Sequence, residues 1–364
     1  MEKTKKLAVI IVFALIIFGF GIAHVIIPDA ELSKAERRKL SKPPELQTET
    51  VFSGKYSKDL ESYLLDQFPM RETFRRMKAA VNNDILMVSD NKGLYRIGDG
   101  LYKLEYPLNV AQVSLAAKKI ESIIAAHPEM GEVYYSVIPD KNYFVAAENS
   151  YPSIDYEAML KTLGEGIQNA EYIDIFDCLT IDDYYRTDTH WKQASLFPVV
   201  ERLCDKMGVP YAPESDYERQ SVSPFYGVLS AQSAISVPAD EIVYLTSSAT
   251  ENARVTSAEL TEPIEVYTLE KLDGMDAYDI FLYGAQAVIS IENPNAQTDK
   301  ELVLFRDSFG SSLAPLLIDS YAKITMVDLR YLSSEILSDY VSFENADVLF
   351  LYSTMLINTA GILR

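Results

Sequence analysis

The chain has 364 residues, of which 48% are hydrophobic, and a formal net charge of −20. This length and apolar content predict one large α/β domain with smaller attachments rather than several independent units. The negative charge argues against nucleic acid and anionic lipid as binding partners.

The N-terminus predicts a membrane anchor. Residues 1–6 hold three lysines and one glutamate, and residues 7–27 are almost purely apolar. At ~1.5 Å per residue, this run is long enough to cross ~30 Å of hydrocarbon, and the lysines should stay in the cytoplasm. Because no clear small-x-small cleavage pattern follows His24, we interpret it as an uncleaved, single-pass signal anchor with everything after it extracytoplasmic. Cleavage as a signal peptide is the alternative.

Three segments follow the apolar run. Residues 28–52 are charged and contain prolines without apolar periodicity, which is typical of a stalk. Residues 53–92 carry apolar side chains near helical spacing, interrupted at Pro69, and predict a helical preface. Residues 93–364 are expected to form the main domain, which opens with a short β segment rich in turn glycines.

Helix and strand patterns alternate through the first half of the main domain. Asn109 is a suitable cap for a helix, and β-branched and aromatic residues mark the strands. The expected order is helix 109–123, strand 132–138, helix 156–167, strand 172–176 and helix 196–207. Residues 208–262 are more polar and predict a smaller, strand-bearing excursion.

The C-terminal part alternates most clearly. The expected elements are strand 302–305, helix 313–318, strand 324–329, helix 333–341 and strand 348–352. Their short connections require parallel strands joined by right-handed crossovers, and ligands of such sheets bind at the carboxyl ends of the strands. Ser308 lies at such an end, in a tight turn where Gly310 opens the next helix.

His190 is the only credible general base in the chain. Of the other two histidines, His24 lies in the apolar run and His127 at a helix end. A serine hydroxyl becomes a good nucleophile when an imidazole takes its proton and a carboxylate orients that imidazole. Asp188 and His190 are two positions apart in an extended segment and therefore point to the same side. We expect a catalytic triad of Ser308, His190 and Asp188.

A purely structural role is the alternative for each of these residues. Asp188 would then cap the following helix, and His190 would be an ordinary surface histidine. Ser308 would simply start helix 313–318. Asp307 is interpreted as a helix-capping carboxylate rather than as a second catalytic acid.

An oxyanion hole requires hydrogen-bond donors close to the nucleophile. The backbone N–H groups of Ser308 and Phe309 are the first candidates, because they lie at a helix N-terminus. Arg330 and Ser353 follow the next two parallel strands and are expected at the same rim. The ordinary alternatives for these two are a salt bridge and a strand-end turn.

Four further residues are candidates for contact with substrate. Lys141 follows a strand and is expected to line the cleft, with Tyr143 nearby as a sugar-stacking ring. With 24 tyrosines in the chain, a core or surface role is the alternative for Tyr143. Trp191 is expected to form a wall of the site and begin the next helix, and Arg306 lies beside the nucleophile turn.

Cys178 and Cys204 are the only cysteines. They are able to pair in an oxidising compartment, but Cys204 falls on the apolar stripe of helix 196–207, which favours a small core residue. No His/Cys cluster has metal-ligand spacing, and there is no glycine-rich phosphate loop and no internal repeat. We expect neither a metal site nor a cofactor.

These motifs resemble the DHHW family of extracytoplasmic bacterial proteins and, more distantly, the SGNH-like domain of the alginate O-acetylation proteins. The matching features are the basic N-terminal anchor and segments 66–71, 138–141, 185–191, 306–309 and 328–331. The resemblance implies an SGNH-hydrolase-like α/β fold, with a parallel sheet flanked by helices after an N-terminal transmembrane helix.

The resemblance also implies an activity. In the SGNH-like relatives, the aspartate and histidine of Asp-x-His-Trp and a later serine form the triad, which corresponds to Asp188, His190 and Ser308. The implied protein is a membrane-anchored serine acyl-transfer enzyme that O-acetylates a cell-surface polysaccharide. A surface glycan is the implied substrate partner, and a multi-pass membrane O-acyltransferase is a candidate partner.

Two departures from the family pattern keep alternatives open. Thr189 replaces the second histidine of the family's name, and Arg306 stands where many SGNH serines follow a glycine. The asparagine donor of SGNH esterases also has no secure counterpart. The alternatives are a carbohydrate esterase that removes acetyl groups, and a non-catalytic glycan-binding or assembly protein of the same fold.

Overall fold

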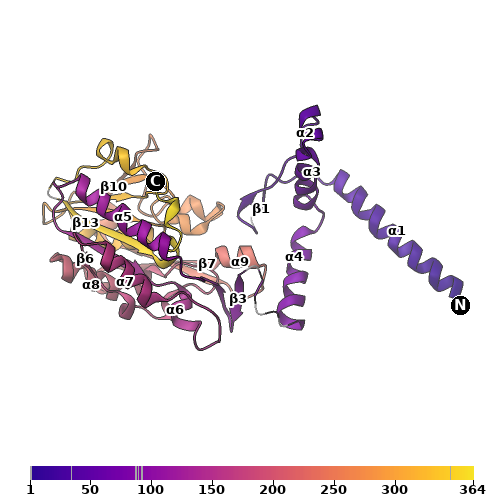
Figure 1. The fold of residues 1–364 in the computed structure, drawn as a ribbon, viewed down its shortest axis with the longest axis horizontal. Coiled ribbons are helices and arrows are strands. Elements are labelled where there is room, and N and C mark those ends of the chain that lie inside the picture. Colours follow the sequence, from indigo (N-terminus) through magenta and orange to yellow (C-terminus); the bar gives the residue numbers. More distant parts are fainter. Residues whose placement is uncertain (1, 34, 87, 89, 92, 345) are drawn as a thin grey trace. The chain divides into compact units, whose positions relative to one another are not determined.

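The computed structural model describes every residue except 1, 34, 87, 89, 92 and 345 (Figure 1). The chain divides into two compact units. The first comprises Met1–Asn91 with Ala231–Ser236, and the second comprises Lys92–Ser230 with Val237–Arg364. Each unit is described by itself below.

A seven-stranded sheet forms the centre of the second unit. Its strands, in spatial order, are β6 (Glu171–Tyr172), β5 (Val133–Ile138), β13 (Ala346–Ser353), β11 (Glu301–Arg306), β12 (Lys323–Val327), β10 (Val288–Glu292) and β9 (Arg254–Ser257). The neighbours from β6 to β12 are all parallel, whereas β10 and β9 join antiparallel. The expected α/β fold with a mainly parallel sheet is therefore confirmed.

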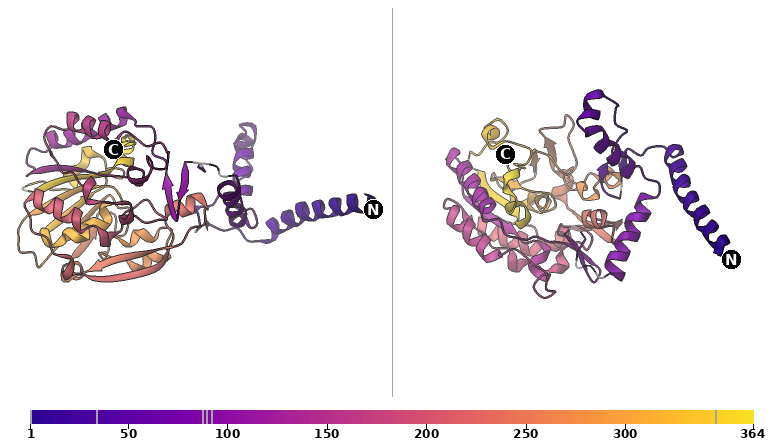
Figure 2. Two further views of the ribbon diagram at one scale, coloured as in Figure 1. Left: turned by 90° about the horizontal axis from the view of Figure 1, so that it is seen from below. Right: turned by 45° about the vertical axis from the view of Figure 1, so that its right-hand side comes forward.

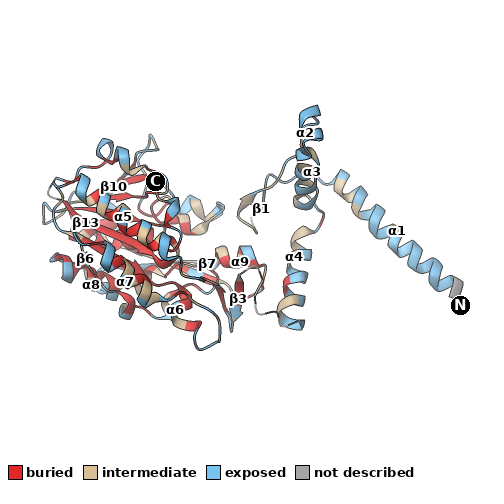
Figure 3. Cartoon of the chain, viewed as in Figure 1, coloured by how far each residue is buried: buried red, intermediate tan, exposed pale blue. Residues whose placement is uncertain are grey.

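The sheet is buried on both faces, as parallel sheets are. Alternate residues of β11 belong to two separate apolar clusters: Leu302 and Leu304 face one, and Val303 and Phe305 face the other. This alternation is the period-two pattern of a strand. Figure 3 shows the result as a red, buried sheet under helices with pale blue outer faces.

Helices cover the two faces. Helices α5 (Val110–Ala126) and α7 (Tyr156–Gly166) contribute their apolar stripes to one cluster, and α8 (Phe197–Met207) contributes to the other. Asn109 caps α5, as expected, by accepting a hydrogen bond from Gln112 N at 3.2 Å. In the left view of Figure 2, the magenta α5 and α7 lie on one side of the yellow and orange strands.

The connections between the C-terminal strands differ from the expected α-helices. After β11, a four-residue α11 (Gly310–Leu313) continues as the 3₁₀ segment η8 (Ala314–Ser320), and after β12 the connection is the 3₁₀ segment η9 (Ser334–Asp339). A 3₁₀ helix rises ~2.0 Å per residue, so α11 and η8 together return about 20 Å, roughly the length of a strand. The same residues as a continuous α-helix would return about 17 Å, which is shorter.

The polar excursion after α8 contains strands, as expected. It holds an antiparallel hairpin of β7 (Glu218–Phe225) and β8 (Asp240–Thr246). The remaining short strands and α-helices of this unit are β3 (Leu94–Ile97), β4 (Gly100–Lys103), α6 (Lys141–Val145), α10 (Ser248–Asn252) and α12 (Thr354–Ile357), and further 3₁₀ segments lie between them. Helix α9 (Val228–Ser233) begins in this unit and ends in the first.

The first unit contains the N-terminal apolar helix. Helix α1 (Glu2–Ile26) includes a 23-residue stretch with mean hydropathy 2.9, which is long and apolar enough to cross a membrane. The other elements are β1 (Leu32–Ser33), β2 (Arg38–Lys39), α2 (Thr48–Phe52), α3 (Lys55–Asp66), α4 (Arg71–Ala80) and the π-helical turn Val81–Ile85. The expected helical preface 53–92 thus contains α3 and α4, while its residues 87, 89 and 92 lie outside the described residues.

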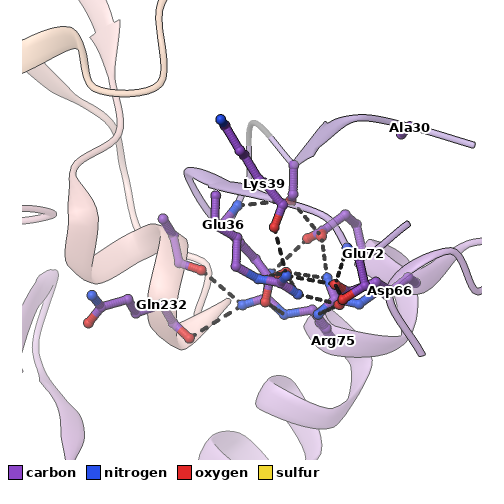
Figure 4. A network of polar contacts seen from close by, with 12 residues as sticks. Ala30, Glu36, Lys39, Asp66, Glu72, Arg75 and Gln232 are labelled. Carbon is purple, nitrogen blue, oxygen red and sulfur yellow. Dashed lines mark hydrogen bonds and ion pairs between the residues drawn. The ribbon is translucent and has the colours of Figure 1, made fainter. Parts of the chain in front are cut away.

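The segment interpreted as a stalk is held to α3 and α4 by a network of ion pairs (Figure 4). Arg38 binds the Asp66 carboxylate in a two-pronged contact, with one hydrogen bond of 2.8 Å, and Arg71 binds Glu36. Arg75 adds a 3.2 Å ion pair to Glu36. Glu36 and Arg38 of this segment are therefore paired with charges on the two helices.

Candidate active site

Three side chains from two distant segments form one line of hydrogen bonds. Ser308 Oγ lies 2.7 Å from Nε2 of His190, although the two residues are 118 positions apart. His190 Nδ1 lies 2.6 Å from Oδ1 of Asp188. Since a carboxylate only accepts, Nδ1 carries the proton, and Nε2 is the acceptor for the serine hydroxyl. Asp188 is fully buried, and Ser308 is the most exposed of the three.

The nucleophile turn is fixed by one carboxylate. Asp307 accepts hydrogen bonds from Phe309 N at 3.0 Å and from Ser353 N at 2.9 Å, and so ties the turn after β11 to the end of β13. Gly310 is required for close packing, because a Cβ there would lie 2.6 Å from Cβ of Arg306. Ser308 therefore sits at the carboxyl edge of the sheet, where the sequence placed it.

The segment carrying the acid and base is fixed from a different direction. Asp188 Oδ2 accepts a 2.7 Å hydrogen bond from Val228 N, and Asp188 Oδ1 accepts from the backbone N of His190 at 3.0 Å. Gly227 allows this approach, since a Cβ there would lie 2.2 Å from Cβ of Asp188. The carboxylate is thus anchored by two backbone donors while it faces the imidazole.

An aromatic ring supports the imidazole, and sequence reasoning missed it. The Tyr278 ring stacks on His190 with centroids 3.9 Å apart and planes 7° from parallel, and it is almost fully buried. Its hydroxyl donates to Ser312 Oγ at 2.8 Å. An electron-rich ring face favours a cation above it, so this stack is suited to a histidine that becomes protonated. With 24 tyrosines, no sequence signal distinguishes this one.

The pKa of His190 reflects two opposing effects. Burial alone lowers the pKa of the imidazole, but the charge of Asp188 and its hydrogen bond outweigh burial and raise the pKa above the ordinary 6.5. More distant charges on Asp276 and Asp307 act in the same direction. His190 is therefore a stronger base than a free histidine, which suits a proton acceptor for a serine hydroxyl.

Two of the expected cleft residues are buried and play other roles. Lys141 is only 6% exposed, and its ammonium donates to backbone carbonyls, including Leu101 O at 2.6 Å, so it does not line a cleft. Trp191 is fully buried and donates through Nε1 to Phe309 O at 3.1 Å, so it is not an exposed wall. Nor does Trp191 begin the next helix, since α8 starts at Phe197.

Arg306 is likewise not a substrate-binding side chain. It is 1% exposed and lies under the nucleophile turn, where its guanidinium faces Asp328 at 3.7 Å and Gly284 O at 3.3 Å. Arg330 is more accessible, with 24% of its side chain exposed, and it binds Asp328 through a 2.6 Å hydrogen bond. Burial lowers the pKa of Arg306, whereas for Arg330 the Asp328 contact outweighs burial and raises the pKa. Arg330 therefore forms the salt bridge given above as its alternative, and its role at the rim stays a prediction.

Two of the groups expected at the oxyanion hole, the Phe309 N–H and the Ser353 hydroxyl, already have hydrogen-bond partners. The N–H of Phe309 is committed to Asp307, which corrects the expectation for that donor, whereas the N–H of Ser308 has no acceptor among the residues described. The hydroxyl of Ser353 accepts from Leu356 N at 3.3 Å and caps α12. Ser353 therefore has the strand-end role given above as its alternative.

Tyr143 and the cysteines complete the comparison with expectation. The Tyr143 ring is 42% exposed and packs edge-on against Phe176, and its role with sugar stays a prediction. Cys178 and Cys204 are both free, and Cys204 lies in the core as its apolar stripe predicts. Within the described part of the chain, no three His, Cys, Asp or Glu side chains are grouped as a metal site.

The fold is similar to those of solved bacterial proteins. A DHHW family protein from Eubacterium siraeum aligns with a TM-score of 0.61 and 21% identity over 75% of this chain and 95% of that one. PatB1 from Bacillus cereus, solved with a sulfonyl adduct, aligns with a TM-score of 0.58 and 18% identity over 72% of this chain and 97% of that one. The resemblance expected from the sequence is thereby confirmed at the level of the fold.

A more distant match is the O-acetyltransferase domain of Pseudomonas putida AlgJ, with a TM-score of 0.44 and 11% identity over 74% of this chain and 93% of that one. No family model matches the sequence. No curated protein matches it either. The similarity of this chain to known proteins therefore lies in its fold.

Proposed function

We propose that this chain is a membrane-anchored, extracytoplasmic serine enzyme that transfers acetyl groups to a cell-surface polysaccharide. The observation that carries the proposal is the continuous hydrogen-bonded line from Asp188 through His190 to Ser308 at the carboxyl edge of the sheet. The fold relatives of this chain also support the proposal, because PatB1 is known with a sulfonyl adduct. The apolar helix α1 supports the anchor.

In the first half-reaction, Ser308 Oγ attacks the carbonyl carbon of the acyl donor while His190 Nε2 takes the hydroxyl proton. Asp188 stabilises the imidazolium through Nδ1, and the Tyr278 ring faces it. The Ser308 N–H is available to the oxyanion of the tetrahedral intermediate. As that intermediate collapses, the donor oxygen leaves with the proton from His190, and Ser308 keeps the acetyl group as an ester.

In the second half-reaction, a sugar hydroxyl gives its proton to His190 and its oxygen attacks the acetyl-serine ester. The bond to Ser308 breaks, and Ser308 recovers its proton from His190. Water is able to replace the sugar hydroxyl in this step, and that outcome defines the esterase alternative.

The first experiment tests whether Ser308 is activated. The full-length protein in detergent is treated with a fluorescent sulfonyl fluoride or fluorophosphonate, beside Ser308→Ala and His190→Ala. We expect labelling to disappear in Ser308→Ala and to fall at least about 10²-fold in His190→Ala. Ser311→Ala is the matched control, because Ser311 lies three residues further along, in α11, and should leave labelling intact. A folded wild type that is not labelled would contradict the proposal and favour a glycan-binding or assembly protein.

The second experiment separates transfer from hydrolysis. Wild type and Ser308→Ala are incubated with an activated acetyl ester, with and without an oligosaccharide acceptor, and the products are analysed by mass spectrometry. Serine-dependent acetylation of the oligosaccharide is expected. Release of acetate alone with every acceptor offered would instead favour the esterase.

A further inference from the structure

Two buried side chains of opposite charge, Lys141 and Asp240, form hydrogen bonds to the backbone segment that carries Asp188 and His190. We propose that Lys141 and Asp240 are positioning residues that hold Asp188 against the imidazole. This inference rests on the proposed function, because it assigns roles in support of the same site. Neither side chain touches the Ser308 hydroxyl, so any effect on it passes through the segment.

Lys141 holds the carbonyl groups of the segment. Its ammonium donates to Tyr185 O at 2.7 Å, Asp188 O at 3.1 Å and Arg186 O at 3.3 Å. It also donates to Leu101 O on β4 at 2.6 Å. Four carbonyl oxygens thus converge on one cation, which joins β4 and the first residue of α6 to the peptide that carries Asp188.

Asp240 holds the N–H groups of the same segment. Its Oδ2 accepts from Thr187 N at 2.7 Å and Thr187 Oγ1 at 2.6 Å, and its Oδ1 accepts from Arg186 N at 3.0 Å. Asp240 is the first residue of β8 and is 5% exposed. The carboxylate therefore binds the segment from the hairpin, while the ammonium binds it from α6.

The charges make this arrangement specific. Buried backbone groups without partners cost about 1–3 kcal/mol each, and hydrogen bonds to ionised groups are stronger than neutral ones. An apolar side chain of similar length at position 141 would fill the space but leave four carbonyl oxygens without this donor. Burial lowers the pKa of Lys141 to about 7, and the charges of Asp188 and Asp240 oppose that shift.

The consequence for the site is geometric. Asp188 receives its side-chain support from Val228 N, but its own backbone is fixed through Lys141 and, one residue earlier, through Asp240 at Thr187. A shift of about 1 Å in this backbone is enough to break the 2.6 Å contact between Asp188 and His190. Misplacement on that scale is able to reduce catalysis about 10²-fold.

The test compares Lys141→Met and Asp240→Asn with wild type in full-length protein. Each is labelled with a sulfonyl fluoride across a range of pH. In this reaction the Ser308 Oγ–sulfur bond forms, the sulfur–fluorine bond breaks, fluoride leaves, and His190 takes the serine proton. The labelling rate should rise with pH to a plateau as His190 loses its proton. In Lys141→Met we expect the plateau rate to fall about 10²-fold and the midpoint of the rise to move to lower pH.

The direction of the midpoint shift distinguishes positioning from simple charge. Loss of the Asp188 contact lowers the His190 pKa, whereas removal of a nearby cation alone would raise it. An unchanged or raised midpoint in Lys141→Met, with Asp240→Asn equal to wild type, would overturn the proposal. If Lys141→Met fails to fold, Asp240→Asn decides through its plateau rate. Loss of the anion alone would lower the midpoint, but only displacement of the segment would also lower the plateau rate, and an unchanged plateau rate would overturn the proposal.

Asn293→Ala is the matched structural control. Asn293 is also buried and donates to Ile318 O at 3.0 Å, far along the chain from the segment. It should lower the melting temperature without moving the midpoint. The His190 titration is also followed by NMR of histidine-labelled protein, assigned with His190→Ala, which requires no chemistry at Ser308. If the wild type is not labelled, the proposed function is contradicted. The NMR titration of His190 still tests whether Lys141 and Asp240 position Asp188.

Discussion

His190 determines how the proposed reaction depends on pH. Only the neutral imidazole accepts the serine proton, and Asp188 raises the His190 pKa above 6.5 despite the opposing effect of burial. The labelling rate of Ser308 should therefore rise with pH, with a midpoint above 6.5 in wild type. Stopped-time labelling at constant ionic strength measures this curve.

Asp188→Asn tests the source of that shift. An asparagine keeps the shape but loses the charge, so the midpoint should move to lower pH and the plateau rate should fall on the order of 10³–10⁴-fold. An unaltered midpoint would mean that Asp188 does not set the basicity of His190. Asp307→Asn is not a suitable comparison, because Asp307 holds the nucleophile turn.

Gly227 is the second residue on which the site depends. A Cβ at this position would meet Asp188 at 2.2 Å from Cβ and 2.6 Å from Cα, and the backbone atom is unable to move cheaply. Gly227→Ala should cost about 1–3 kcal/mol of unfolding free energy and reduce labelling of Ser308, because it displaces Asp188. Urea unfolding and labelling rates measure the two effects.

Gly164→Ala provides the contrast in the same unit. A Cβ there meets only Tyr135 Oη at an ordinary 3.7 Å, and Gly164 lies inside α7. Alanine should therefore stabilise the protein by up to about 1 kcal/mol and leave labelling unchanged. If both glycine variants behave alike, the packing argument at Gly227 is wrong.

At the scale of elements, the ion pairs between Asp66 and the segment of β1 and β2 make a separate prediction. The hydrogen bond from Arg38 lowers the pKa of Asp66 well below its usual range, despite partial burial, and Ser41 N also donates to it at 2.9 Å. Asp66→Asn should speed hydrogen exchange at the Ser41 amide roughly tenfold, since it weakens hydrogen bonds worth about 1.5 kcal/mol.

Acid provides an independent check on the same contact. Because the folded-state pKa of Asp66 is lowered, its stabilising contribution is present above the unfolded value near 3.8 and is lost as pH falls through the lowered folded value. Lys42→Ala is the control. Lys42 pairs with Glu31 at the surface, where both side chains are at least 75% exposed, so its loss should not alter the exchange rate.

The sequence did not predict that the connections after β11 and β12 contain 3₁₀ segments. The apolar run after Gly310 has helical spacing, but Pro315 and the need to cover a whole strand length favour 3₁₀ geometry in η8. The positions of β11 and β13 were predicted more accurately, because both strands are buried on both faces and read as continuous apolar runs. The strand expected at 172–176 is instead the two-residue β6. The connection length that decides between helix types is a property of the assembled sheet.

At the scale of the whole molecule, α1 predicts how the protein partitions. The full-length chain should remain with membranes after alkaline carbonate extraction, whereas a chain of residues 28–364 should be soluble. Its C-terminal part should be digested by protease added outside intact cells. The intact mass of the purified protein distinguishes an uncleaved anchor from a signal peptide, since cleavage would remove about 27 residues. Recovery of a shortened, soluble native protein would contradict the anchor.

The sequence alone predicted the three residues of the candidate triad. With three histidines in the chain, one of them next but one to an aspartate, the base and its partner followed by elimination, and the nucleophile followed from the strand-turn-helix pattern around Ser308. The parallel sheet also followed from apolar periodicity. These features are local, because each depends on residues within a few positions of one another.

The tertiary structure alone decided which side chains support that site. Lys141 meets the acid-bearing segment 47 positions away, Asp240 meets it 53 positions away, and Tyr278 stacks on an imidazole from another part of the chain. In the sequence, Lys141 and Asp240 cannot be distinguished from charged residues at the surface, since propensity and periodicity describe only neighbours along the chain. Their partners are backbone groups, whose positions exist only once the sheet, the hairpin and the intervening loops have packed together.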